Sequence, residues 1–388
     1  MLLSDRADED NACDACQSRT ELFSIASRDG VTTINGQIDH PDQNVTRDIV
    51  LLVPGSGLFD RHYLLGESET DEDFIFDQLA LDTLKLGLSV LRFDSRGISG
   101  NRRDPRLKEA GSTISRERLF FEHFVDSNIR QTVTPDTQVD DLFNLYCLCA
   151  NTYNKIMLIG HSEGTISIGR MIAKYGPTID NIIFISPALE SPRSLFEWQA
   201  VDRMVQWIKE INPDSGTIAI NDIRRRFGFS KLSSIYTISS VIPYRGAWTS
   251  DGLQAMLEKR RADFYSERAW TINNDDSLPW PGPSPTTQAS FAWWKQWFLD
   301  DRPCILDLNE FSGNVHCVFG DYDTQTDYER QYLQFRTSKD HVAASLSFSV
   351  IPGVGHTLGL HGLLGPMTTA SRDVIRSIIV NWRSSMLV

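Results

Sequence analysis

Short runs of β-branched and other apolar residues recur along this chain, and stretches with helical spacing separate most of them. The runs lie at residues 49–53, 88–93, 156–159, 182–185, 315–319 and 346–351. Mostly apolar runs suit strands that are covered on both faces, and their alternation with helices is typical of parallel βαβ units with right-handed crossovers. The sequence therefore predicts an α/β fold with one mostly parallel, doubly wound sheet.

The segments between these runs predict the helices that cover the sheet. Apolar residues recur with a period close to the helical value of about 3.6 in residues 74–86, 139–151, 165–175, 327–337 and 371–384. Residues 21–38 are expected to form a leading pair of strands. The dipeptides Asp29-Gly30 and Asn35-Gly36 both favour turns in this segment.

The alternation stops between residues 191 and 303, which contain eight of the nine tryptophans. Amphipathic spacing, as in Leu195 to Ile211, predicts a helical cap inserted between two strands of the core. Residues 21–190 and 304–388 would then form the core, after a poorly ordered tail at 1–20. Most cap aromatics are expected to fill a small second core, although some could line a substrate pocket.

The net charge of −13 argues against a protein that binds nucleic acid, because phosphate binding needs clustered Lys and Arg. The chain has no stretch approaching the roughly 20 apolar residues that cross a bilayer, and Met1 does not open a secretory signal. A cytoplasmic protein that does not bind membranes is expected. The oligomeric state is open, with a homodimer as one alternative.

No metal or organic cofactor is predicted. Cys13 and Cys16 form a lone C-x-x-C without two further ligands at suitable spacing. The acidic run at 67–73 is better explained as a solvated loop than as a metal site. Gly55-Ser56-Gly57 lacks the third glycine of a dinucleotide-binding fingerprint.

The segment Gly160-His161-Ser162-Glu163-Gly164 follows one of the apolar runs and precedes a predicted helix. A serine hydroxyl is a weak nucleophile until it is exposed on a sharp turn and paired with a base. The G-x-S-x-G pattern between a strand and a helix provides such a turn, and glycines on both sides let the backbone approach closely. Ser162 is therefore the predicted nucleophile.

An acid and a histidine should follow the serine in that order. Asp321 and Asp323 both come after the run at 315–319, and we favour Asp323 because a turn explains Asp321. His356 follows the last run on a glycine-rich loop and is the predicted general base, with His361 as the alternative.

An oxyanion formed during acyl transfer needs two backbone N–H donors. One is expected from Glu163, the residue after the nucleophile. The other is expected from the loop after the run at 49–53, where Ser56 is favoured over Gly57.

Four linked motifs resemble the α/β-hydrolase esterases of the EstD-like kind. They are Val53-Pro54-Gly55-Ser56-Gly57, Asp60-Arg61, the segment Leu91 to Gly97, and Gly160 to Gly164. The resemblance covers roughly residues 45–190 and 313–360. It implies an α/β-hydrolase fold and a carboxylic-ester hydrolase with a Ser162–Asp323–His356 triad, without metal or cofactor. The chain departs from the family at Thr165, where a second glycine is usual.

Charged residues in these motifs are expected to form structural ion pairs around the loop after residue 53. They are Asp60, Arg61, Arg92, Asp94 and Arg96.

The predicted function is hydrolysis of an ester, or a related acyl bond, in a small-molecule substrate through an acyl-enzyme intermediate. An acyltransferase, a peptidase or a tailoring enzyme for a bulky metabolite would use the same triad. A third alternative is a binding protein on a hydrolase scaffold that does not catalyse a reaction. Such proteins usually lose a triad member, whereas all three members are predicted here.

Overall fold

The computed structural model describes most of the core and small parts of the region between residues 203 and 300. The described residues are 19–42, 46–65, 74–109, 113–203, 206, 217–219, 247–249, 251–252, 254–255, 258–259, 262, 293, 295–297, 300–360 and 365–384. Cys13, Cys16, the acidic run at 67–73, His361 and most of the predicted cap lie outside these residues.

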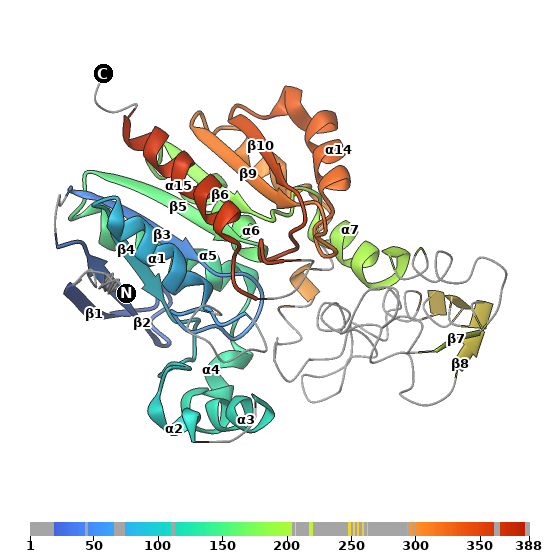
Figure 1. Cartoon of the computed structure of the whole chain (residues 1–388), viewed down its shortest axis with the longest axis horizontal. Coiled ribbons are helices and arrows are strands. Elements are labelled where there is room, and N and C mark those ends of the chain that lie inside the picture. The colour runs from blue at the N-terminus through green and yellow to red at the C-terminus, as the bar shows by residue number, and fades with distance from the viewer. Residues whose placement is uncertain are drawn as a thin grey trace, which may run out of the picture.

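An eight-stranded sheet with the order β1-β2-β4-β3-β5-β6-β9-β10 forms the centre of the molecule (Figure 1). The strands are β1 (Arg19–Ala26), β2 (Thr33–His40), β3 (Asp48–Val53), β4 (Ser89–Phe93), β5 (Lys155–His161), β6 (Asn181–Ile185), β9 (Asn314–Gly320) and β10 (Ser345–Ile351). Neighbours in the series β4-β3-β5-β6-β9-β10 pair in parallel, and β2 pairs antiparallel with both β1 and β4. The predicted mostly parallel, doubly wound sheet is confirmed, and each predicted run coincides with a strand.

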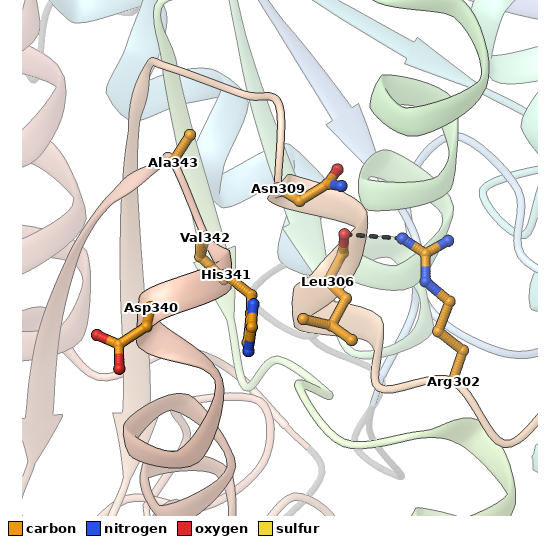
Figure 2. A pocket seen from close by; sticks show the side chains of 7 residues that line it. All are labelled: Arg302, Leu306, Asn309, Asp340, His341, Val342 and Ala343. Atoms are coloured by element: carbon orange, nitrogen blue, oxygen red, sulfur yellow. Dashed lines mark hydrogen bonds between the residues drawn. The ribbon is translucent and has the colours of Figure 1, made fainter.

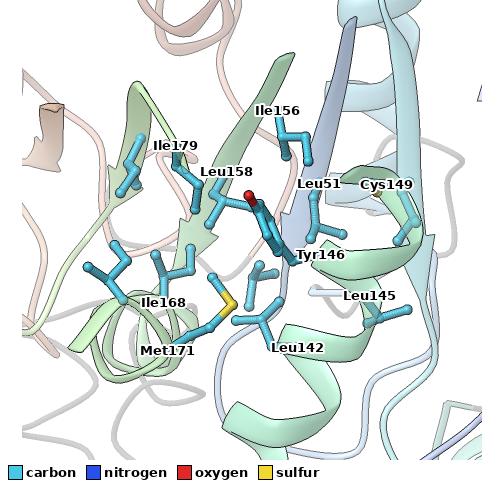
Figure 3. Close-up of a cluster of buried hydrophobic side chains, with 14 of the residues drawn as sticks. Leu51, Leu142, Leu145, Tyr146, Cys149, Ile156, Leu158, Ile168, Met171 and Ile179 are labelled. Carbon is cyan, nitrogen blue, oxygen red and sulfur yellow. The ribbon is translucent and has the colours of Figure 1, made fainter. Parts of the chain in front are cut away.

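Helices cover both faces of this sheet. Their bounds are α1 (Ile75–Lys85), α5 (Pro135–Ala150), α6 (Glu163–Tyr175), α14 (Tyr328–Ser338) and α15 (Thr369–Ser384). Apolar side chains of α1 and α15 pack on one face, and those of α5 and α6 pack on the other. Figure 3 shows this second layer, in which Leu142, Leu145 and Met171 meet Leu51 and Leu158 of the strands. These five helices match the five predicted from apolar spacing.

Three helices between β4 and α5 were not predicted. They are α2 (Pro105–Lys108), α3 (Thr113–Phe124) and α4 (Ser127–Gln131). Aspartate side chains cap α2 and α4, since Asp104 accepts from the N–H of Arg106 and Asp126 accepts from that of Ile129. At four and five residues, α2 and α4 carry too few apolar repeats to stand out by periodicity, so their caps are the better sequence signal.

One of the two turn predictions in the leading hairpin was wrong. Strands β1 and β2 join through residues 27–32, where Gly30 has a φ of 71°, as the Asp29-Gly30 pair predicts. Gly36, however, lies inside β2. A Cβ there would lie 2.2 Å from the Phe23 ring and 2.6 Å from the carbonyl oxygen of Arg92. This glycine permits close packing within the sheet and does not form a turn.

Between β6 and β9 the chain leaves the sheet, at the position predicted for the cap. Its described parts include α7 (Pro192–Glu197), a π-helix η2 (Trp198–Asp202), and the antiparallel strands β7 (Thr217–Ala219) and β8 (Ala247–Thr249). The small β7-β8 sheet was not expected in a helical cap. A 3-10 helix η4 (Cys304–Leu308) leads back to the core, and a second one, η5 (Lys339–His341), follows α14.

Within the described part of the chain, no helix combines the length and the apolar character needed to cross a bilayer.

Candidate functional site

Ser162 occupies a sharp turn between β5 and α6. Its backbone has φ 53° and ψ −124°, in the left-handed half of φ space that residues with a Cβ rarely adopt. The helix begins at the next residue, Glu163, so the positive end of the α6 dipole points toward the turn. The predicted strand–serine–helix turn is therefore present.

The glycine two residues after the serine explains why the turn can sit so close to β3. A Cβ on Gly164 would lie 2.5 Å from the carbonyl oxygens of both Val53 and Pro54. The family that the sequence resembles usually has glycine at the position of Thr165. Here the Thr165 hydroxyl donates a hydrogen bond to the carbonyl oxygen of Ser162 at 2.6 Å. This bond closes the first turn of α6 over the serine.

His356 and Asp323 form a buried pair on the loops that follow β10 and β9. The Nδ1 atom of His356 lies 2.9 Å from Oδ2 and 3.1 Å from Oδ1 of Asp323. The carboxylate also accepts from the N–H groups of Gln325 and Thr326 and from the Thr326 hydroxyl. Burial alone would raise the pKa of Asp323, but His356 and these donors hold it below its usual range.

The alternative acid, Asp321, has a different role. It lies in the exposed turn after β9, and its Oδ1 accepts from the N–H of Gly353 at 2.6 Å. The structure therefore pairs His356 with Asp323 and uses Asp321 to join the two loops. In a neutral imidazole whose Nδ1 donates to the carboxylate, Nε2 is the atom that can accept a proton.

The loops that hold Ser162 and His356 both follow parallel strands of one sheet, so they meet at the same edge. The ring centroids of His161 and His356 are 4.8 Å apart, so His161, which directly precedes Ser162, packs against His356. Among the described residues, no hydrogen bond joins the Ser162 hydroxyl to His356. Such bonds are often long in unliganded enzymes.

A buried hydrogen-bond chain, not predicted from the sequence, ties these loops together. Nε2 of His161 lies 2.9 Å from the carbonyl oxygen of His356, so it must carry the proton. Nδ1 of His161 then accepts from the Tyr63 hydroxyl at 2.6 Å, and the Tyr63 oxygen accepts from the N–H of Gly55 at 2.9 Å.

This chain requires His161 to be neutral. Burial and the neighbouring His356 lower the pKa of His161 to about 3. Tyr63 is itself held with a positive φ of 55°. The chain thus fixes the loop after β3, the serine turn and the histidine loop relative to one another. A tyrosine eight residues after Gly55 carries no recognisable sequence signal, which is why it was missed.

A pocket opens beside Ser162. It is lined by Ser56, Ser162, Glu163, Ile166, Ala188, Pro192, Leu195, Phe196, Gln199, Trp293, Trp297 and Gln325. The two residues predicted to donate to an oxyanion, Ser56 and Glu163, thus lie in the wall that contains Ser162. As the first residue of α6, Glu163 has a backbone N–H without a partner inside the helix. The predicted cap contributes much of the lining, namely Pro192, Leu195, Phe196, Gln199, Trp293 and Trp297.

The Glu163 side chain has a raised pKa, in contrast to the lowered pKa of Asp323. Both of its oxygens are buried, and its hydrogen-bonding neighbours are the side chains of Ser56 and Trp297. Burial raises the pKa of Glu163 to about 7, although Ser56, Arg170, Arg130 and Trp297 act in the opposite direction.

The charged motif residues form structural ion pairs, as predicted, and one of these pairs, Arg61–Asp94, holds the loop after β3. Arg61 donates to Asp94 through Nε at 3.0 Å and through Nη2. Arg92 pairs with Asp39 and Asp77, and Arg96 pairs with Asp141 and Asp29. Asp60 accepts from the N–H of His62 at 3.0 Å. These contacts agree with a structural role for the charged motif residues.

A second hollow lies between η4 and η5, away from the serine turn. Figure 2 shows its polar side chains Arg302, Asn309, Asp340 and His341 around Leu306. The Arg302 guanidinium donates to the Leu306 carbonyl oxygen at 2.8 Å and pairs with Asp307. None of the predicted site residues belongs to this hollow.

Comparison with known proteins identifies the fold. No protein-family model and no curated protein matches the sequence. Among solved structures, a thermostable carboxyl esterase from Bacillus coagulans in complex with glycerol is similar, with a TM-score of 0.52 at 16% identity. The match covers 95% of this chain and 99% of that one.

The structure of DcsB in complex with its substrate analogue is also similar, with a TM-score of 0.51 at 14% identity. It covers 94% of this chain and 99% of the other. At these identities the likeness concerns architecture, and together with the strand order and the serine turn after β5 it identifies this chain as having the α/β-hydrolase fold.

Proposed function

We propose that the protein is a serine hydrolase that cleaves carboxylic esters of small molecules through a Ser162–His356–Asp323 triad. The observation that carries the proposal is the buried Asp323–His356 pair at the same sheet edge as Ser162, whose backbone is held at a φ of 53° on a strand–helix turn beside a pocket. The esterase named among the structural neighbours agrees with this function.

In the proposed mechanism, Nε2 of neutral His356 takes the proton of the Ser162 hydroxyl as its oxygen attacks the ester carbonyl. Asp323 holds the tautomer and stabilises the imidazolium. The backbone N–H groups of Ser56 and Glu163 stabilise the oxyanion. His356 then gives its proton to the leaving alcohol, and a water molecule activated by His356 releases the acid and regenerates Ser162.

The direct test is Ser162→Ala. Turnover of a p-nitrophenyl acyl ester should fall by at least about 10⁴-fold, because no other group in the proposal supplies the nucleophile. The circular dichroism spectrum and melting temperature should stay close to wild type. A fluorophosphonate probe should label the wild-type protein at Ser162, as located by peptide mass spectrometry. Retained turnover in Ser162→Ala, or labelling at another residue, would refute the assignment.

Acyl transfer would use the same groups with an alcohol or amine in place of water. Product analysis in the presence of a competing primary alcohol separates the two outcomes. Hydrolysis predicts free acid as the main product, whereas a transferase would yield mainly the new ester.

A further inference from the structure

The two edges of the central sheet differ in how they are protected. Strand β1, at one end, carries the charged residues Arg19 and Glu21, which form an exposed ion pair at 3.5 Å. Strand β10, at the other end (Figure 1), contains neither a charged residue nor a proline, and no further strand of the described part of the chain pairs with it. Edge strands present unpaired N–H and C=O groups, which proteins usually guard with such residues against pairing with other chains. The β10 edge lacks this protection.

Exposed apolar side chains gather at the same edge. Leu333 of α14 is 61% exposed, and Tyr332 of α14 and Val350 of β10 are 36% and 39% exposed. The Tyr332 ring joins the helix to the strand, because its centroid lies 5.3 Å from that of Phe348 in β10. Phe348 and Val350 are two residues apart and therefore lie on the same face of the strand. Contiguous exposed apolar groups of this kind mark interaction surfaces.

The charges of α14 are arranged symmetrically about this apolar centre. Glu329, Tyr332, Leu333 and Arg336 are all exposed, and their spacing of three and four residues places them on one face of the helix. Glu329 comes three residues before Tyr332, and Arg336 comes three residues after Leu333. A second α14, turned antiparallel about an axis between Tyr332 and Leu333, would therefore place its Arg336 opposite Glu329 and its Glu329 opposite Arg336. This face is complementary to itself, as a two-fold symmetric interface requires.

The strand is compatible with the same axis. Phe348 is the middle residue of β10, and it contacts Tyr332 at the centre of the exposed helix face. The centres of the two elements thus lie side by side. A two-fold axis that passes beside Phe348 can pair β10 antiparallel with a second β10, and it brings the two α14 helices together in the antiparallel arrangement that their charges favour.

We propose that β10 and α14 form the interface of a two-fold symmetric homodimer. Strand β10 pairs antiparallel with β10 of the second copy, so that the two sheets become continuous, and α14 lies antiparallel to α14 of the second copy with Glu329 facing Arg336. A second copy fits this face better than an unrelated protein, because only a second copy repeats the order of its charges. The inference is independent of the proposed ester hydrolysis, since neither element lines the pocket beside Ser162.

Sedimentation velocity of the full chain measures the association. The wild-type protein should sediment at micromolar concentrations with twice the chain mass of 43.9 kDa. Leu333→Arg places two like charges beside the axis and should raise the dissociation constant by about 100-fold or more. Val350→Lys, which adds a charge of the kind that guards natural edge strands, should also weaken the dimer. The matched control is Leu22→Arg on β1, where the leucine is 72% exposed, and it should leave the dissociation constant unchanged.

Glu329→Arg and Arg336→Glu test the antiparallel arrangement of the helices. In a symmetric dimer each single variant creates two contacts between like charges, so each should raise the dissociation constant by about tenfold. The double variant that carries both substitutions has opposite charges at both contacts again, and its dissociation constant should return toward the wild-type value. Circular dichroism spectra should match the wild type in all of these variants.

A wild-type protein that stays monomeric at micromolar concentrations would overturn the proposal. A dimer that Leu333→Arg leaves intact would place the interface elsewhere and overturn it as well. A double variant that associates no more tightly than the two single variants would contradict the pairing of Glu329 with Arg336. Fluorophosphonate labelling of Ser162 in Leu333→Arg reports separately on the proposed hydrolase, so the failure of one proposal is distinguishable from the failure of the other.

Discussion

Two buried carboxyl groups at the same edge of the sheet behave in opposite ways. Asp323 lies beside His356, accepts hydrogen bonds from four donors, and has a pKa below its usual range. Glu163 lines the pocket, has Ser56 and Trp297 as its hydrogen-bonding neighbours, and has a pKa raised to about 7. Burial raises the pKa of both groups, so the partners decide the direction of each shift.

The comparison suggests a division of roles. A carboxylate with all its lone pairs engaged within the protein suits a fixed charge that orients His356. A buried carboxyl group whose pKa is raised to about 7 changes its charge near neutral pH, so Glu163 does not suit that role.

The largest effect is expected for Asp323→Asn. Asparagine cannot stabilise the imidazolium and favours the wrong tautomer of His356, so kcat should fall by about 10³–10⁴-fold. The matched control is Asp321→Asn, which alters the exposed bond to Gly353 and should change kcat by less than about threefold. Steady-state kinetics on a p-nitrophenyl ester checks both. Equal losses in the two variants would contradict the assignment of Asp323.

Glu163→Gln should change how stability depends on pH. The folded pKa of about 7 exceeds the reference value of 4.5, so the native state binds more protons than the unfolded state between these values. Wild-type stability therefore contains a contribution that is lost as pH rises from about 4.5 to 7.

Glutamine does not titrate, so the stability of Glu163→Gln relative to wild type should rise by roughly 3 kcal/mol between pH 4.5 and pH 8. Urea unfolding at several pH values measures this difference. A difference that does not vary with pH would mean that Glu163 is not desolvated as described.

Tyr63→Phe tests whether the two sides of the site are held together by the chain through His161. The variant leaves the N–H of Gly55 and Nδ1 of His161 without partners in a buried setting, which should cost about 1–3 kcal/mol. Because the bond to the His356 carbonyl oxygen depends on the tautomer of His161, kcat should also fall by about tenfold with little change in KM. A lower free energy of unfolding with an unchanged kcat would limit Tyr63 to a structural role.

The smallest effect is expected for Thr326→Val, which removes one neutral donor to Asp323 and keeps the shape of the side chain. Loss of this 2.7 Å bond should lower the free energy of unfolding by about 1 kcal/mol and kcat by a few-fold. Thermal unfolding and kinetics at neutral pH check it. An effect as large as that of Asp323→Asn would mean that Thr326 acts in catalysis itself.

Much of this fold follows from local pattern. The side chains of the apolar runs at 49–53 and 156–159 point alternately to the two faces of the sheet, so burying them requires helices on both faces. The repetition of such runs therefore determined the strands and the helices between them. The turn at Ser162 was equally local, since a strand, two glycines and a helix within ten residues leave few backbone paths.

Tertiary contacts decided the remainder. Asp321 and Asp323 are equivalent by position in the sequence, and only the approach of the β10 loop selects Asp323 as the partner of His356. The hydrogen-bonded chain from Tyr63 through His161 joins segments 98 residues apart. The dipeptide Asn35-Gly36 favours a turn by its sequence, but in the fold Phe23 and Arg92 pack against Gly36 within the sheet. Strand and helix patterns arise from the periodicity of neighbouring residues, whereas pKa values, tautomers and pocket walls depend on which distant groups burial brings together.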